Sequence, residues 1–233
     1  MKTVKLFTLL LTISLFACYT AMAVINEREL SSFSEISLRI PGTVHLNQGN
    51  TQSISIKASE STLEEIITEV KDRTLIIRFK NNNFFWRTFN PGKIDIYISV
   101  PEIDALFVAG SGNIKGTSID TRILDLAVSG SGDISVGQVN CERMKVAISG
   151  SGNINLNSGR TIDLNAAISG SGNFRGADFA ADNVDTRISG SGNCTITAHK
   201  VLTAKVSGSG SVVYKGNPQL DSAVSGSGRI KKL

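Results

Sequence analysis

Residues 128–136 read "VSGSGDISV", and this short phrase returns at nearly constant intervals along the chain. The related stretches are "VAGSGNIKG" at 108, "ISGSGNINL" at 148, "ISGSGNFRG" at 168, "ISGSGNCTI" at 188, "VSGSGSVVY" at 206 and "VSGSGRIKK" at 224. The first glycines of the seven copies are Gly110, Gly130, Gly150, Gly170, Gly190, Gly208 and Gly226. Four intervals of 20 residues are therefore followed by two of 18. A fixed period of this length indicates a solenoid.

The residues before each glycine pair have the period of a β-strand. In "ILDLAVSG", Leu124, Leu126 and Val128 fall on one face, and the residues between them fall on the other. Aligned copies give three apolar columns, which predict the interior of a β-helix. The first column is Val108, Val128, Ile148, Ile168, Ile188, Val206 and Val224. The second is Ile114, Ile134, Ile154, Phe174, Cys194, Val212 and Ile230, and the third is Leu124, Met144, Leu164, Val184, Leu202 and Leu220.

These columns predict an all-β, single-domain parallel β-helix with coils of about 20 residues, because one coil cannot bury its own apolar face but stacked coils can. Parallel crossovers are generally right-handed, so we expect a right-handed helix. The columns stay in phase through the change from 20 to 18 residues, which places the two-residue deletion between the GSG corner and the next strand.

The glycines mark a corner where coils approach closely, and small residues permit that approach. Next to the corner we expect a ladder of hydrogen bonds between copies of one polar position. Its members are Asn113, Asp133, Asn153, Asn173 and Asn193. A flexible linker is disfavoured because apolar residues flank each SGSG, and a dinucleotide fingerprint lacks its third glycine at Lys115. A calcium-binding roll would need a regular aspartate, which only Asp133 supplies.

Residues 24–100 lack the marker but still indicate strands, and we expect them to form an irregular cap continuous with the solenoid of residues 101–233. "EISLRI" and "VHLNQ" flank a turn at Pro41-Gly42, and "STLEEIITEV" is the one stretch compatible with a short helix. "TLIIRFK" is expected to pair with "KIDIYISV" across a longer loop. At the other end, Arg229, Lys231 and Lys232 are charges that discourage end-to-end stacking.

Residues 1–23 have the layout of a bacterial secretory signal, with Lys2 and Lys5 before an apolar run. Cleavage is expected after Ala21-Met22-Ala23, and the alternative is a lipobox-like site at Cys18 that would leave a lipid anchor. Export to the periplasm, the outer membrane surface or the extracellular space follows. Removing the two lysines leaves 22 basic against 20 acidic residues without a basic stripe, which argues against nucleic acid as a partner.

The chain resembles the bacterial head GIN domain family of autotransporter adhesins over roughly residues 30–230. The resemblance rests on "FSEISLRIPGTVHLNQG", "LIIRF", "IDIYISVPEIDALFVAGSGNI" and the serial GSG coils. It implies a role at the cell surface or in the periplasm and brings no catalytic residues.

Little in the sequence points to catalysis. His45 and His199 lack a nucleophile motif beside them and are interpreted as surface side chains. Cys141 and Cys194 lie nearly three coils apart, too far for a disulfide, so two free thiols are expected. An enzyme site would best fit a patch of charged residues on adjacent coils, although its alternating signs favour a solvated ion-pair face. The patch comprises Asp185, Arg187, Thr203, Lys205 and Asp221.

The best candidate for ligand contact is the aromatic stretch "NNNFFWRTFNPG". Its contact residues would be Phe84, Phe85, Trp86, Arg87 and Phe89. They could stack on sugar rings or anchor a protein, or they could form an apolar lid over the open end of the coil stack.

The sequence therefore predicts a non-enzymatic, adhesin-like module that binds a glycan or protein at the cell surface without a cofactor or metal. The alternatives are a carbohydrate-active β-helix enzyme and a structural envelope protein that assembles through its coil ends.

Overall fold

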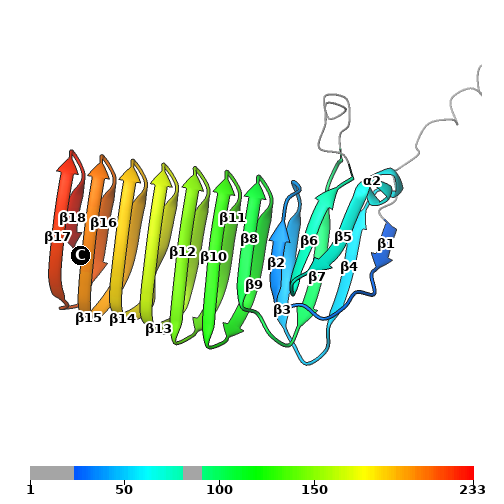
Figure 1. Cartoon of the computed structure of the whole chain (residues 1–233), viewed down its shortest axis with the longest axis horizontal. Coiled ribbons are helices and arrows are strands. Elements are labelled where there is room, and N and C mark those ends of the chain that lie inside the picture. Colours follow the sequence, from blue (N-terminus) through cyan, green and yellow to red (C-terminus); the bar gives the residue numbers. More distant parts are fainter. Residues whose placement is uncertain (1–23, 81–90) are drawn as a thin grey trace, which may run out of the picture.

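The computed structural model describes residues 24–80 and 91–233, which form one continuous right-handed parallel β-helix (Figure 1). The N-terminal strands are β1 (Val24–Glu27), β2 (Glu35–Leu38), β3 (Thr43–Gln48), β4 (Ser53–Ala58), β5 (Ile66–Lys71), β6 (Thr74–Phe79) and β7 (Asp95–Val100), with the helix α2 (Glu60–Glu65) between β4 and β5. The repeats contain β8 (Ala105–Gly110), β9 (Asn113–Asp120), β10 (Ile123–Gly130), β11 (Asp133–Asn140), β12 (Arg143–Gly150), β13 (Asn153–Gly170), β14 (Asn173–Gly190), β15 (Asn193–Gly208), β16 (Ser211–Lys215), β17 (Gln219–Gly226) and β18 (Arg229–Lys232).

Each coil is flattened into two strands that belong to two opposite faces (Figure 1). The first face stacks β6, β2, β8, β10, β12, the C-terminal halves of β13, β14 and β15, and β17. The second face stacks β7, β3, β9, β11, the N-terminal halves of β13, β14 and β15, and then β16 and β18. All of these neighbours are parallel. Apolar residues from the two faces meet between them and form the core.

The register confirms the three predicted columns. Val128 pairs with Ile148 and Ile148 with Ile168, and the columns through Ile134 and Leu124 continue in the same way. These inward side chains are at most 3% exposed from Leu124 as far as Val206 and Val212. Inward residues of successive coils therefore lie directly above one another.

The change of period also falls where the sequence places it. β14 and β15 are 20 residues apart at Gly176 and Ile196, and 18 residues apart at Asn183 and Val201. The register shifts lie between these two pairs, in the arc that follows the GSG corner. The interior columns keep their alignment because the deletion is absorbed in the arc between the two halves of β15.

The N-terminal third contributes two full coils of the parallel stack. β2 and β3 lie between β6 and β7 on one side and β8 and β9 on the other. Leu38 pairs with both Ile77 and Val108, so a coil early in the chain is inserted between two later ones. In the described chain, β1, β4 and β5 pair antiparallel and, with α2, form the irregular cap.

The expected pairing of "TLIIRFK" with "KIDIYISV" is wrong. β6 pairs with β2 and β5 on the first face, whereas β7 pairs with β3 and β4 on the second face. The two strands are consecutive in the chain but lie on opposite faces of one flattened coil. Each therefore hydrogen-bonds along the solenoid axis instead of to the other.

The two ends of the stack differ. The cap covers the first coil, whereas β17 is exposed along its whole length. The inward residues Leu220 and Val224 are 42% and 45% exposed there. No helix in residues 24–80 or 91–233 is long and apolar enough to cross a membrane.

Candidate functional site

The second face carries an exposed aromatic pair close to the cap. Tyr97 of β7 and His45 of β3 are cross-strand partners. Their rings stack with centroids 4.9 Å apart and an interplanar angle of 16°. Tyr97 is 46% exposed, whereas most large apolar side chains of the described residues are buried in the core. An exposed, ordered aromatic ring is a common contact surface for ligands.

The buried carboxylate of Asp95 orients the His45 side chain. His45 Nε2 lies 3.1 Å from Asp95 Oδ1, and Lys93 Nζ lies 2.9 Å from Asp95 Oδ2. Asp95 itself is only 7% exposed. The hydrogen bond from Lys93 lowers the pKa of Asp95, burial opposes that effect, and the contact with His45 adds to it. The ionised carboxylate therefore orients the imidazole that supports the Tyr97 ring.

Small polar side chains surround the aromatic pair. On the side of Tyr97 away from His45, its cross-strand neighbour is Ser55 of β4. A shallow hollow of about 410 Å³ extends over this region, lined by Tyr97, His45, Asn47, Ser53, Ser55, Ser99, Lys115 and Thr117 among others. The side chain of Ser55 is too short to cover the face of the Tyr97 ring that lies opposite His45. That ring face is therefore open, with serine hydroxyl groups beside it. This combination of a ring and hydroxyls suits a sugar better than a purely apolar ligand.

Polar side chains continue from this pair along the second face. His45 pairs with Lys115, Lys115 with Ser135, and Ser135 with Asn155. Asn155 Nδ2 donates to Ser135 Oγ at 3.1 Å, and Arg175 Nη1 donates to Asn155 Oδ1 at 3.1 Å. The outward side chains therefore form one ordered row along the solenoid axis.

The predicted corner ladder lies beside this row and is confirmed. Asn153 donates from both its backbone N and Nδ2 to Asp133 Oδ1 at 2.8 Å. Asn173 Nδ2 donates to Asn153 Oδ1 at 2.8 Å, and Asn193 Nδ2 to Asn173 Oδ1 at 2.9 Å. These amides are largely engaged with one another, so the ladder stabilises the fold and leaves recognition to the neighbouring row.

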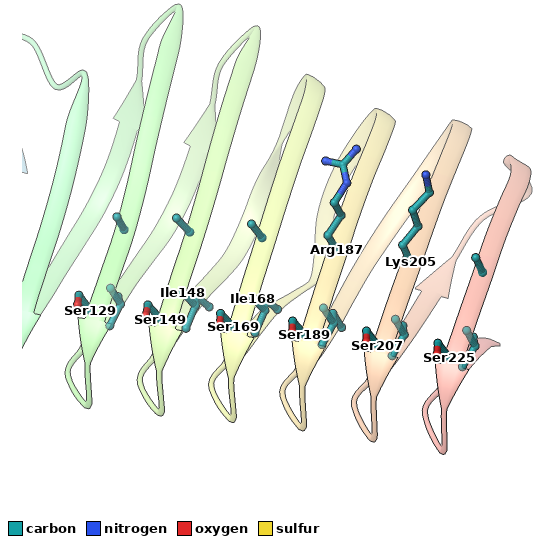
Figure 2. A pocket seen from close by; sticks show the side chains of 18 residues that line it. Ser129, Ile148, Ser149, Ile168, Ser169, Arg187, Ser189, Lys205, Ser207 and Ser225 are labelled. Atoms are coloured by element: carbon teal, nitrogen blue, oxygen red, sulfur yellow. The ribbon is translucent and has the colours of Figure 1, made fainter.

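The first face has a different surface. Figure 2 shows a row of serines from Ser129 to Ser225 beside the GSG loops, with the side chains of Arg187 and Lys205 extending away from this row and from the loops. Between these side chains lies an open groove of about 830 Å³ whose surface is mainly apolar and includes Ala127, Ala147 and Ala167. The groove is a stripe of small residues on a flat sheet.

The predicted charged patch forms as expected on the same face, and two of its residues, Arg187 and Lys205, line the groove. Asp185 pairs with Thr203, Arg187 with Lys205, and Thr203 with Asp221. Arg187 Nη2 lies 2.8 Å from Asp185 Oδ2. A carboxylate engaged by a neighbouring arginine favours the ion-pair interpretation over acid–base chemistry.

A third hollow, of about 960 Å³, lies at the corner opposite the GSG loops and has a mainly polar lining. It includes Asp120, Arg122, Glu142, Cys141 and His199. Within the described chain, no three His, Cys, Asp or Glu side chains are placed to hold a metal ion.

The two cysteines are free, as predicted. Cys141 is half-buried, and its Sγ lies 3.4 Å from Thr161 Oγ1, whereas Cys194 is fully buried in the second column. Burial raises the pKa of the Cys141 thiol and raises that of Cys194 to about 12. Both thiols are therefore poor nucleophiles.

The other predicted residues have mixed outcomes. The contact candidates Phe84, Phe85, Trp86, Arg87 and Phe89 lie outside the described residues, so their role as lid or contact site stays a prediction. His199 is exposed, as expected, while His45 is half-buried in a specific stack. The sequence interpretation missed Tyr97. Its signal was the alternation in "KIDIYISV", which turns Tyr97 outward among inward isoleucines.

The fold places the chain among the solenoid proteins, in which each coil contacts only its neighbours. The chain belongs to the family described as "Putative auto-transporter adhesin, head GIN domain", whose sequence pattern matches residues 32–218. The expected family membership is thereby confirmed. A search of curated proteins finds no match to this chain.

Solved structures share the fold. A "putative adhesin" from Bacteroides fragilis superposes with a TM-score of 0.86 at 23% identity, covering 92% of this chain and 98% of that one. A "putative lipid binding protein" from Parabacteroides distasonis has a TM-score of 0.72 at 23% identity, with coverage of 92% and 98%. A "putative adhesin" from Parabacteroides merdae has a TM-score of 0.72 at 22% identity, with coverage of 92% and 97%. At these identities the likeness establishes the fold alone.

Proposed function

We propose that this chain is an exported, non-enzymatic binding module that acts at the bacterial cell envelope in the manner of an adhesin. The observation that supports this most is the Tyr97–His45 stack, an ordered and exposed aromatic pair set in a hydroxyl-lined hollow on a rigid face. A rigid surface binds without losing conformational freedom of its own backbone. Family membership and adhesin-named neighbours agree with a surface role.

We propose that residues 1–23 are a cleaved signal that directs export. In the mature protein, residues 24–100 would form the cap region and residues 101–233 the repeats. Cleavage after Ala23 would release a soluble protein, whereas processing at Cys18 would leave a lipid anchor. A glycan or a protein on a neighbouring surface would be the partner. The aromatic stretch at residues 84–89 would add a second contact or serve as the lid.

The experiment compares bacteria that produce the full chain with the same strain lacking it. Attachment to immobilised mucin and to purified envelope polysaccharides is measured, together with fractionation of the cells and release of new reducing ends. We expect the chain in the envelope or medium, increased attachment and no reducing ends. A chain that stays in the cytoplasm overturns export, and steady release of reducing ends supports the carbohydrate-active enzyme instead.

A second candidate is a structural protein that assembles through its coil ends, favoured by the exposed Leu220 and Val224 on the last coil. The unpaired edge of β17 could accept a strand from another molecule. Light scattering as a function of protein concentration tests this candidate. A mass that stays at one chain over a hundredfold concentration range removes it.

A further inference from the structure

The row of polar side chains on the second face has a defined repeat. Its members lie on successive strands from β7 to β14, and each is the direct cross-strand partner of the next. They are Tyr97, His45, Lys115, Ser135, Asn155 and Arg175. Neighbouring strands are roughly 4.8 Å apart, a spacing close to the length of one pyranose residue in an extended polysaccharide. An extended sugar chain parallel to the solenoid axis would therefore present one residue to each coil.

The aromatic end of the row fits one sugar ring. His45 covers one face of Tyr97, and the other face looks over Ser55, whose side chain is too short to cover it. The apolar face of a pyranose can stack on that open ring face. Ser53, Ser55 and Ser99 line the same hollow and can hydrogen-bond to the sugar hydroxyls.

The charge of the row selects the kind of polysaccharide. Lys115 and Arg175 are exposed, and among the described residues neither forms an ion pair with a carboxylate. Arg175 is held by Asn155, so its guanidinium is ordered and its charge uncompensated. Two cations without ion-pair partners, three coils apart, favour a polymer that carries carboxylates at regular intervals.

Nearby carboxylates do not cancel these cations. Asp95 is engaged by Lys93 and His45. Asp133 lies in the neighbouring column, where it accepts hydrogen bonds from Asn153, and among the described residues it forms no ion pair with Lys115 or Arg175. Glu27 of the edge strand β1 pairs with Ser55, on the cap side of Tyr97. It is exposed there and places a negative charge at the cap end of the row. The row thus becomes more positive away from the cap.

We propose that this row binds an extended acidic polysaccharide of the uronate type, with one sugar stacked on Tyr97 and carboxylates facing Lys115 and Arg175. The proposal rests on the proposed function, since it names the ligand class of that same surface. Stacking at Tyr97 supplies the sugar specificity, and the two cations supply the preference for acidic chains.

The test uses the full chain and polygalacturonate as probe, with fully methyl-esterified polygalacturonate as its uncharged match and poly-L-glutamate as a polyanion without sugar rings. Affinities are measured by calorimetry in low salt. We expect binding to polygalacturonate that weakens with added salt, and much weaker binding to the other two polymers. Equal affinity for poly-L-glutamate would reduce the site to a general polyanion surface and overturn the proposal.

Variants locate the site. Tyr97→Ala is expected to weaken polygalacturonate binding roughly tenfold and Tyr97→Phe to retain it. Lys115→Gln and Arg175→Gln should each weaken it about threefold and reduce its salt dependence. Lys145→Gln, on the first face, is the matched control and should change nothing. Unchanged affinity in folded Tyr97→Ala, or no binding of polygalacturonate at all, overturns the inference. The proposed function survives that result if producing cells still attach to mucin or to other envelope polysaccharides, and it fails separately if they do not.

Discussion

The carbonyl oxygen of Gly130 lies 2.5 Å from the position that a Cβ atom would occupy on Gly150. The backbone of Gly150 also has a φ of +118°, which side chains of L-residues rarely adopt. Successive corners therefore stack so closely that only hydrogen fits between them. This close approach explains why "SGSG" returns in each repeat from Gly130 to Gly226.

The Gly150→Ala substitution is consequently expected to lower the free energy of unfolding by about 2 kcal/mol or more, since strain and overpacking add. Urea unfolding measures it. The matched control is Gly116→Ala, where a Cβ would meet Val136 at an ordinary 3.5 Å. If both variants unfold at the same urea concentration, the corner is not the tight contact described.

One apolar column offers a matched pair of valines with different burial. Val128 is 1% exposed and Val224 is 45% exposed, although both occupy the same position of the repeat. Val128→Ala should cost about 2–3 kcal/mol through lost burial and a cavity, and Val224→Ala less than about 1 kcal/mol. Urea unfolding of the two variants measures the difference. Similar losses would mean that the last coil is covered in solution, as end-to-end assembly requires.

The amide ladder gives a third prediction. Asn173→Ala removes the bond donated to Asn153 and the bond accepted from Asn193, so we expect a loss of about 1–3 kcal/mol. Asn183→Ala removes one exposed bond to Asp163 and should cost less than about 1 kcal/mol. Thermal unfolding monitored by circular dichroism compares them. An Asn173 variant as stable as the wild type would show that the ladder adds nothing to stability.

The acid sensitivity of the Tyr97 site depends on Asp95. Its pKa is lowered in the folded protein, chiefly by Lys93, so its ionised form stabilises the fold above its unfolded pKa of about 4. That contribution is lost as the pH falls through the lower, folded pKa. The stability difference between wild type and Asp95→Asn is therefore expected to be present at neutral pH and to shrink below about pH 4.

Urea unfolding at neutral and acidic pH measures this dependence. Asp221→Asn, on the exposed strand β17, is the control and should leave stability unchanged at both pH values. A difference between wild type and Asp95→Asn that grows on acidification would reverse the assigned sign.

The thiols provide a chemical test of the register. Because Cys194 is buried with a pKa of about 12, alkylation at pH 8 should leave it unmodified until the protein unfolds. Cys141 is half-buried and should react slowly in the folded chain. Peptide mapping by mass spectrometry assigns each label. Rapid labelling of Cys194, or a Cys141–Cys194 crosslink, contradicts the interior column.

The sequence by itself determined the repeating part of the molecule. Each GSG corner and each alternating strand recurs with the same local pattern, so aligning the copies also aligns the residues that pair in space. Val128 with Ile148 and Asn153 with Asn173 could be matched in this way. The physical reason is that neighbouring coils are neighbouring repeats, and every coil needs the same apolar contacts to bury its inner face.

Only the tertiary structure decided the arrangement outside the repeats. The coil formed by β2 and β3 is inserted between the coil of β6 and β7 and the first GSG coil. Nothing local in "EISLRI" specifies that Leu38 pairs with both Ile77 and Val108. The same insertion brings His45 onto Tyr97, 52 positions later in the chain. Such contacts depend on the order in which coils stack, which follows from packing over the whole molecule and leaves no period in the sequence.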